Sequence, residues 1–203
     1  MSSRLFNPHL VPKPPRDDSP LMRRLFESGR TVDIEVGCGV GYHPIQYALS
    51  HPERYLVAIE RTSEKFSKFA RRLEAHPAIN NILPVHADAV NWVSHHVLEA
   101  SISRYFILYP NPYPKAKHSN LRFGRMLFMA HVFDSLVPGG TLTLATNERH
   151  YFDEAKKHLV QDFGFAVVQS GAIDPKDFVP RSHFEKKYLK SGQTCFNLVL
   201  KKP

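Results

Sequence analysis

An apolar strand that runs directly into a glycine-rich turn constrains the fold more than any other stretch. Residues Thr31–Val36 form a compact apolar run, and Gly37–Gly41 then carries glycine at every other position. Glycine lets a backbone turn tightly and approach a ligand with no Cβ in the way. A helix is expected to begin near His43, because Pro44 suits a first helical turn. Strand, glycine turn and helix together form the nucleotide-site unit of a doubly wound sheet.

The spacing of these glycines distinguishes two kinds of site. A dinucleotide-binding turn carries G-x-G-x-x-G. Here the third glycine comes one residue early, and Tyr42 stands where that pattern has glycine. The spacing therefore disfavours a loop that cradles a pyrophosphate. It is instead similar to motif I of S-adenosylmethionine-dependent methyltransferases.

Apolar runs of strand length alternate with helical patterns along the rest of the chain. Further strands are expected at Tyr55–Ile59, Ile82–His86, Tyr105–Leu108, Thr141–Ala145, Ala166–Gln169 and Cys195–Leu200. Helices are expected at Leu21–Ser28, Ser63–Ala75, Val90–Ala100, Leu121–Leu136 and 147–160. This order predicts an α/β, Rossmann-like fold with a mostly parallel seven-stranded sheet, an antiparallel end and helices on both faces.

Residues 1–20 and a segment near the C-terminus differ in composition from the rest of the chain. Residues 1–20 contain five prolines and little apolar periodicity, which predicts a flexible N-terminal arm. Residues 21–203 are expected to form a single domain. Within that domain the segment Ile173–Lys190 is rich in basic residues, and we expect it to be irregular.

Polar side chains follow several expected strands. Glu60 comes about 20 residues after the glycine turn, where a carboxylate can accept hydrogen bonds from both ribose hydroxyls. The alternative for Glu60 is a surface pair with Arg61. Asp88 can accept from an adenine amine or cap the next helix, and the sequence leaves both open. Since the carboxyl ends of parallel strands meet at one edge, Glu35, the glycines, Glu60, Asp88 and Asn111 should surround one ligand.

A stiff, basic loop follows the strand at Tyr105–Leu108. Prolines alternate with other residues in Pro110–Pro114, and a basic run extends from there to Arg122. Proline fixes φ and has no N–H, so this loop cannot be helical. Such a loop can hold a polar side chain and an aromatic ring at a pocket mouth. The basic run beside it indicates a large anionic substrate.

Composition narrows the partners and the setting. The formal net charge of +8 favours a polyanionic partner, with nucleic acid preferred over membrane. No run of 18 apolar residues occurs, so no membrane-spanning segment is expected. Two cysteines, Cys38 and Cys195, give neither a disulfide framework nor a metal cluster and fit a reducing, cytoplasmic setting.

Over roughly residues 31–201 the chain resembles the TrmB-type tRNA (guanine-N7)-methyltransferases. Members of that family carry E-I-G-x-G-x-G, G-I-E, an Asp-Ala pair, F-P-D-P-W-P-K-x-R-H-x-K-R-R, Thr-Asp and T-x-F-E. The matching segments here are Glu35–Gly41, Ala58–Glu60, Asp88–Ala89, Tyr109–Arg122, Thr146–Asn147 and Ser182–Glu185. The proline, lysine and histidine frame of Tyr109–Arg122 is the most specific of these.

The resemblance implies methyl transfer from S-adenosylmethionine to N7 of a guanosine in the tRNA variable loop. It implies cofactor contacts from Glu35, Gly37, Gly39, Gly41, Glu60, Asp88 and Ala89. It implies Asn111 as the catalytic residue and contacts to the target base from Asn111, Tyr113, Asn147, Ser182 and Glu185. Phosphate contacts would come from Lys115, Lys117, His118, Arg122 and Arg181. The implied partner is tRNA, without membrane or metal, and the protein is expected to be a monomer or homodimer.

The chain departs from the family motif at positions that matter. Asn111 and Asn147 stand where the family has Asp, Tyr113 stands for Trp, and Asn120 replaces a basic residue. A carboxylate can accept two N–H groups from guanine, whereas an amide offers one acceptor and one donor group, a pattern that could match adenine. The alternatives are therefore a methyltransferase for another base, RNA or small molecule, or a catalytically weakened RNA-binding paralogue.

Overall fold

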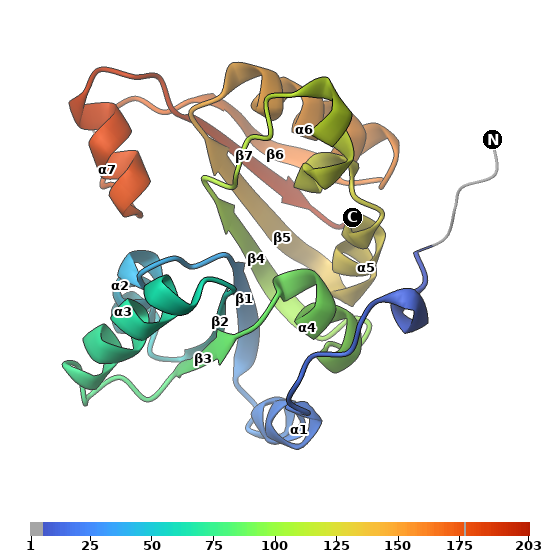
Figure 1. Ribbon diagram of the computed structural model, residues 1–203, viewed down its shortest axis with the longest axis vertical. Coiled ribbons are helices and arrows are strands. Elements are labelled where there is room, and N and C mark those ends of the chain that lie inside the picture. Colours follow the sequence, from blue (N-terminus) through green and yellow to red (C-terminus); the bar gives the residue numbers. More distant parts are fainter. Residues whose placement is uncertain (1–5, 177) are drawn as a thin grey trace.

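A seven-stranded sheet forms the centre of the molecule (Figure 1). The computed structural model describes residues 6–176 and 178–203, and the strand order is β3-β2-β1-β4-β5-β7-β6. The strands are β1 (Thr31–Val36), β2 (Arg54–Glu60), β3 (Ile82–His86), β4 (Ile102–Leu108), β5 (Leu136–Thr146), β6 (Ala166–Ala172) and β7 (Phe196–Lys201). β1 to β5 pair in parallel, and β7 runs antiparallel to β5 and β6. The predicted fold class is confirmed.

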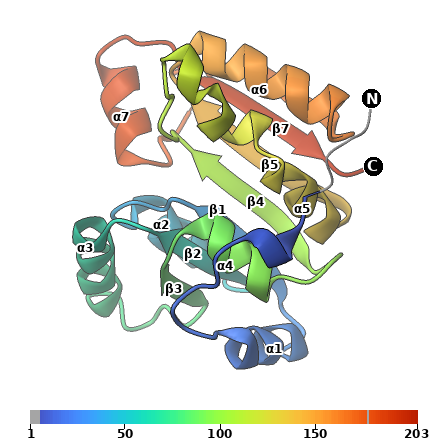
Figure 2. The ribbon, with the colours of Figure 1, turned by 45° about the vertical axis from the view of Figure 1, so that its right-hand side comes forward.

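Helices cover both faces of this sheet (Figures 1 and 2). They are α1 (Ser19–Glu27), α2 (Tyr42–Ser50), α3 (Ser63–Glu74), α4 (Ala89–His96), α5 (Phe128–Ser135), α6 (Arg149–Gln161) and α7 (His183–Lys190). The helices α1, α4, α5 and α6 pack on one face, where Trp92 and Phe128 share a core with Ile34 of β1. On the other face Ala48 of α2 and Phe69 of α3 pack around β2 and β3.

The expected strands are present because short apolar runs fix them locally. β1 and β3 have the predicted bounds, β7 is shifted by one residue toward the C-terminus, and the other strands extend the predicted runs by one or more residues at an end. Ile34, Val57 and Ile107 are fully buried on three neighbouring strands. Burial on both faces is what a central parallel sheet requires, so these strands read as continuous apolar runs.

The helix predicted at Leu121–Leu136 is wrong. The segment instead forms 3-10 turns at Ala116–Leu121 and Phe123–Arg125, and only then α5. Gly124 lies so close to α6 that a Cβ there would stand 2.6 Å from Ala155 Cα. The Phe123 N–H donates to the Tyr151 hydroxyl at 3.1 Å. Contacts with α6 therefore override the helical periodicity of the segment.

β5 begins earlier than predicted, at Leu136 rather than Thr141. The Gly139 N–H donates to the Lys202 carbonyl, and the Lys202 N–H donates to the Gly140 carbonyl, both at 2.9 Å. The Pro-Gly-Gly stretch thus pairs with the chain beyond β7. Its turn-forming composition gave no sign of this pairing, which depends on residues about 60 positions away.

The segment expected to be irregular, Ile173–Lys190, contains α7. Ser182 caps this helix by accepting the Glu185 N–H at 3.1 Å. Serine followed three residues later by glutamate is the capping-box pattern, a local signal for a helix start. A second predicted helix boundary is also wrong: α4 ends at His96 and not at Ala100. Ala100 has a φ of 47°, which lies outside the helical region.

Residues 1–5 of the expected arm lie outside the described residues. The part that follows lies along α4 (Figure 2), where His95 Nε2 is 2.9 Å from the Val11 carbonyl. Asp18 is buried, and its carboxylate accepts the Trp92 indole N–H at 2.8 Å. The division of the chain at residue 20 stays a prediction. None of the described helices is long and apolar enough to cross a membrane.

Candidate cofactor and substrate site

A cavity of about 530 Å³ opens at the carboxyl ends of β1, β2 and β4. Its walls come from the glycine turn, the start of α4, the proline loop after β4 and the start of α7. It brings together nine of the predicted site residues: Glu35, Gly37, Gly39, Glu60, Asp88, Ala89, Asn111, Tyr113 and Ser182. The other predicted site residues lie outside its lining: Gly41, Lys115, Lys117, His118, Arg122, Asn147, Arg181 and Glu185.

The glycines of the turn serve two different purposes. All three have positive φ, and Gly37 and Gly39 have nothing within 4 Å of an added Cβ. These two leave the backbone open to the cavity. At Gly41 an added Cβ would stand 2.0 Å from Phe69 Cδ2 of α3. Gly41 is therefore required by packing between the turn and α3.

Glu60 is held by the backbone at the end of β2. One carboxylate oxygen accepts the Gly39 N–H at 2.9 Å and the other accepts the Thr62 N–H at 2.7 Å. The surface pair with Arg61 is not formed among the described ion pairs. Each carboxylate oxygen has a second lone pair, so Glu60 can still accept two hydroxyl groups.

A buried pair below the turn was missed by the sequence analysis. Glu35 Oε2 lies 2.7 Å from His43 Nδ1, both side chains are at least nine-tenths buried, and both line the cavity. The carboxylate comes from β1 and the histidine from α2, eight positions further along the chain. That separation belongs to no helix or strand period, so the sequence carried no signal for the contact.

Asp88 caps α4, which is one of its two predicted roles. Its Oδ1 accepts the Val90 and Asn91 N–H groups at 3.0 and 3.3 Å. Its Oδ2 lies 3.5 Å from the Arg61 guanidinium and remains at the cavity. The cap thus leaves one oxygen of the carboxylate for a ligand.

The proline loop is held in a strained shape by a buried cation. Tyr109 and Tyr113 have φ of 53° and 43°, values that non-glycine residues rarely adopt. The Arg122 guanidinium donates twice to the Tyr113 carbonyl, at 3.1 and 2.8 Å, and once to Glu154 at 2.8 Å. Arg122 is 8% exposed, so it braces the loop against α6.

Asn111 lies in the exposed part of the proline loop. Its Oδ1 accepts the Tyr113 N–H at 3.2 Å, which closes a turn within the loop. The side-chain NH2 group has no hydrogen-bond partner among the described residues, and Asn111 lines the cavity. The amide therefore offers the cavity a donor, where the family's aspartate would keep a second acceptor oxygen.

Glu185 is fully buried and fully bonded. Its two oxygens accept from the Tyr109 hydroxyl at 2.9 Å, from the Arg181 backbone N–H at 2.6 Å, and from the Arg181 guanidinium at 2.7 and 3.2 Å. Burial, together with Cys195 and Glu185, raises the pKa of Tyr109 well above its usual range, so its hydroxyl keeps its proton. Glu185 and Arg181 thus fasten α7 to the end of β4.

Asn147 lies on the loop between β5 and α6. Its side-chain amide donates to the Glu148 carboxylate at 3.2 Å and is half-buried. Lys115 and Lys117 are exposed, and His118 meets the Tyr113 ring edge-on, with 6.3 Å between centroids. Tyr109, His43 and His183 also line the cavity, although none was predicted as a site residue.

The strand order and a glycine turn facing the cavity define the class: a Rossmann-like methyltransferase fold. The 16S rRNA methyltransferase KamB matches with a TM-score of 0.71, covering 92% of this chain and 94% of that chain at 17% identity. A 16S rRNA (adenine(1408)-N(1))-methyltransferase from Catenulisporales acidiphilia, solved with S-adenosylmethionine, matches with a TM-score of 0.65 over 92% of each chain at 16% identity. At these identities the likeness shows the fold.

Sequence comparison identifies the family within this class. The family model Methyltransf_4, described as "Putative methyltransferase", matches residues 29–198. A tRNA (guanine-N(7)-)-methyltransferase of Chlorobium phaeobacteroides is 31% identical over 173 residues, 85% of this chain and 82% of the relative. One from Chlamydia trachomatis serovar D is 28% identical over 177 residues, 87% of this chain and 79% of the relative. The chain belongs to the TrmB-type tRNA (guanine-N7)-methyltransferase family, and the resemblance drawn from its motifs is confirmed.

Proposed function

We propose that this protein transfers a methyl group from S-adenosylmethionine to N7 of a guanosine in the variable loop of tRNA. The observation that carries the proposal is the convergence of the glycine turn, Glu60, Asp88 and Asn111 on one cavity. The names of its relatives support the reaction and the nucleic acid. We further propose a cytoplasmic setting, in keeping with two free, buried cysteines, and a monomer or homodimer.

The cavity fits the cofactor on the protein's own geometry. Gly37 and Gly39 leave open space where a Cβ would project, and Glu60 keeps two lone pairs for the ribose hydroxyls. Asp88 Oδ2 is available for an adenine amine. Ala89 adds to the cavity wall, and Glu35 is fixed by His43. Bound there, S-adenosylmethionine supplies an electrophilic sulfonium methyl group.

The protein's part in the reaction is chiefly to position the guanine. N7 has a lone pair and carries no proton, so attack forms the N7–carbon bond while the sulfur–carbon bond breaks and its electron pair stays on sulfur. No proton is released, and no side chain has to act as a strong base. What the site must supply is alignment and exclusion of water.

We assign the base contacts to the proline loop and the start of α7. Asn111 presents its NH2 group, Tyr113 presents its ring, and Ser182 lies on the facing wall. Asn147 would meet the nucleotide from the loop after β5. Glu185 is assigned a positioning role in place of base binding, because its oxygens are already occupied by Tyr109 and Arg181.

We assign phosphate contacts at this loop to Lys115, Lys117 and His118. The two arginines that the resemblance added to this set are already engaged in hydrogen bonds. Arg122 donates to Tyr113 and Glu154, and Arg181 donates to Glu185. A cation that already braces the fold is poorly placed to follow a flexible phosphate. The two lysines should together contribute about 1.4 to 1.8 to the slope of log K against log salt.

The experiment that tests the function is methyl transfer from labelled S-adenosylmethionine into unmodified tRNA, with the product nucleosides identified by mass spectrometry. We expect 7-methylguanosine in the variable loop. The donor group of Asn111 favours, as the second candidate, a methyltransferase for another base, and a different methylated nucleoside would establish that reaction instead. Binding of S-adenosylmethionine without transfer to any RNA would contradict both.

A further inference from the structure

The helix α7 has two contrasting faces. On one, Phe184 stacks on Tyr188, with 6.2 Å between ring centroids, and Tyr188 approaches Tyr109 at 5.7 Å. On the other, Lys186, Lys187 and Lys190 are exposed. No carboxylate of the described residues pairs with these lysines. Together with His183 they follow the i, i+3, i+4, i+7 spacing of one helical face, which begins at the cavity wall.

A second row of cations starts at the same cavity. Lys65 of α3 lines the cavity and is exposed, and it has no ion-pair partner among the described residues. Arg72, two turns further along the same edge of α3, donates to the Val40 carbonyl at 3.2 Å. This edge of α3 therefore lies beside the glycine turn.

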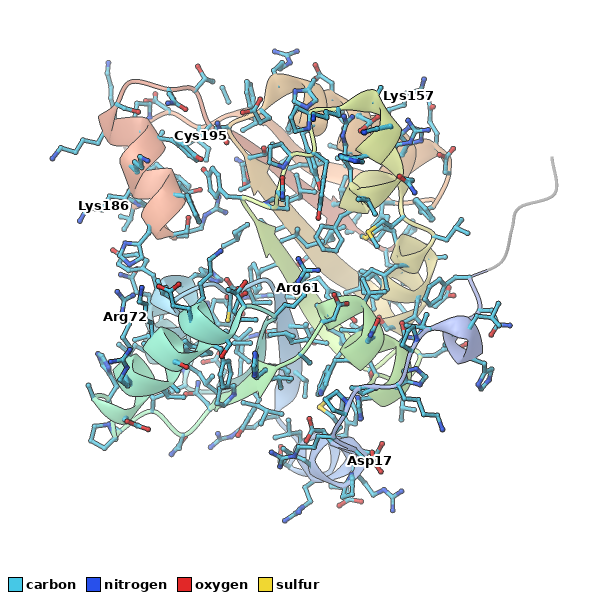
Figure 3. The ribbon with its side chains drawn as sticks, viewed as in Figure 1. Asp17, Arg61, Arg72, Lys157, Lys186 and Cys195 are labelled. Carbon is cyan, nitrogen blue, oxygen red and sulfur yellow. The ribbon has the colours of Figure 1, made fainter. Side chains whose placement is uncertain are left out.

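The two rows meet at the cavity. Arg72 Nη1 is 3.0 Å from His183 Nε2, and the centroid of the His183 ring lies 4.7 Å from that of the Tyr42 ring. In Figure 3, Arg72 of α3 and Lys186 of α7 lie on the same side of the molecule. Burial, then the positive charges of Arg72 and Lys186, lower the pKa of His183. A positive surface thus adjoins the mouth of the site.

We infer that this α3–α7 surface, formed by Lys65, Lys186, Lys187 and Lys190, binds the phosphate backbone of the RNA substrate. The inference rests on the proposed function and adds a second contact area to the proline loop. A base that enters the cavity brings its flanking phosphates to the mouth, where these unpaired cations stand. RNA fits better than a membrane, because the surface adjoins the cavity that takes the base and α7 exposes only one large apolar side chain, Phe184, among its described residues.

The test compares two lysines on different helices. Lys186 of α7 stands near the cavity, whereas Lys157 of α6 lies on a distant part of the molecule (Figure 3). Binding of fluorescently labelled, unmodified tRNA is measured over a series of salt concentrations. We expect Lys186→Ala to reduce the slope of log K against log salt by about 0.7 to 0.9, and Lys157→Ala to leave it unchanged.

Removing all three α7 lysines enlarges the effect. The variant K186A/K187A/K190A should reduce the slope by about 2 to 3, and adding Lys65→Ala should reduce it further. Calorimetric binding of S-adenosylmethionine by the triple variant should match wild type, which shows that the fold is intact.

The outcomes separate the surface from the function. If wild type methylates tRNA and the triple variant keeps the wild-type salt slope, the inference that the α3–α7 surface binds RNA is wrong, while the proposed function stands. If wild type neither binds nor methylates tRNA, the proposed function fails first. If Lys157→Ala reduces the salt slope as much as Lys186→Ala does, the protein attracts tRNA through its net charge as a whole. That result would overturn the inference of a specific α3–α7 binding surface.

Discussion

Glu185 shows how one buried side chain can fix a whole wall of the site. Its carboxylate joins Tyr109 at the end of β4 to Arg181 ahead of α7. We expect Glu185→Gln to lower the free energy of unfolding by about 2–4 kcal/mol, because the Arg181 charge loses its partner. Tyr109→Phe should cost about 1–2 kcal/mol, since only one hydrogen bond is lost. Denaturant titration measures both.

Hydrogen exchange distinguishes a fastened helix from a base contact. In Glu185→Gln the amides of α7 should exchange faster than in wild type, while those of α3 should not change. A variant with wild-type stability and exchange that nonetheless fails to methylate would instead place Glu185 on the guanine.

The amide of Asn111 sets a prediction about specificity. Returning the family's carboxylate with Asn111→Asp restores a second acceptor oxygen beside the bond to the Tyr113 N–H. We expect kcat/KM for guanine in tRNA to rise about tenfold, because charge-assisted hydrogen bonds are the stronger kind. Asn111→Ala should lower it several-fold, with unchanged affinity for S-adenosylmethionine. Equal rates in all three proteins would remove Asn111 from the base site.

The glycines of the turn offer a matched pair of substitutions. Gly41→Ala places a Cβ 2.0 Å from Phe69 Cδ2 at a φ of 79°, so we expect a loss of stability of about 2–4 kcal/mol. Gly39→Ala meets open space and should cost only about 1–2 kcal/mol, but it should weaken cofactor binding. Thermal unfolding and calorimetry separate the two effects. Comparable instability in both variants would contradict the division of roles.

At the scale of elements, the loop Pro110–Arg122 depends on α6 through Glu154. Burial raises the pKa of Glu154, but hydrogen bonds from Arg122 and Arg125 outweigh it, so the pKa is lowered. The folded state therefore binds a proton less readily than the unfolded state. The resulting stability is present above the ordinary glutamate pKa of about 4.3 and is lost as pH falls through the folded value.

The measurement is the stability of wild type and Glu154→Gln across acidic pH. We expect a constant difference above about pH 4.3 that shrinks on further acidification. Asp153→Asn is the control, because its pair with Arg149 is largely exposed and should contribute little. A difference that grows toward low pH would refute the assignment.

The helices and strands differ in how well the sequence alone predicts them. Strands such as Thr31–Val36 were predictable because their apolar runs and burial are local. The helix expected at Leu121–Leu136 failed because Gly124 touches α6, a contact that no local pattern records. The helix α7 carried a readable signal in Ser182 and Glu185, but its basic composition favoured an irregular segment.

The site divides in the same way. Glu60, Asp88 and Asn111 were predictable because strand ends meet at one edge of a parallel sheet. The pair of Glu35 with His43 was not, because it depends on how side chains turn once the fold is made. Arg181 and Glu185 stand at the local i, i+4 spacing of an ion pair, but the resemblance implied phosphate and base contacts for them instead. The motif alone could not tell a cation that binds phosphate from one that braces a loop.

At the scale of the whole molecule, Trp92 can report whether the chain unfolds as one unit. It is the only tryptophan, it is 1% exposed within the main core, and its indole N–H donates to Asp18. We expect tryptophan fluorescence and helical circular dichroism to change in one coincident transition. Asp18→Ala should lower the midpoint in both signals by leaving the indole unpaired, a loss of about 1–3 kcal/mol. Asp17→Ala, at an exposed neighbour (Figure 3) whose carboxylate accepts the Ser19 N–H at the start of α1, should lower it less. Separate transitions would show that the N-terminal segment and the sheet unfold independently.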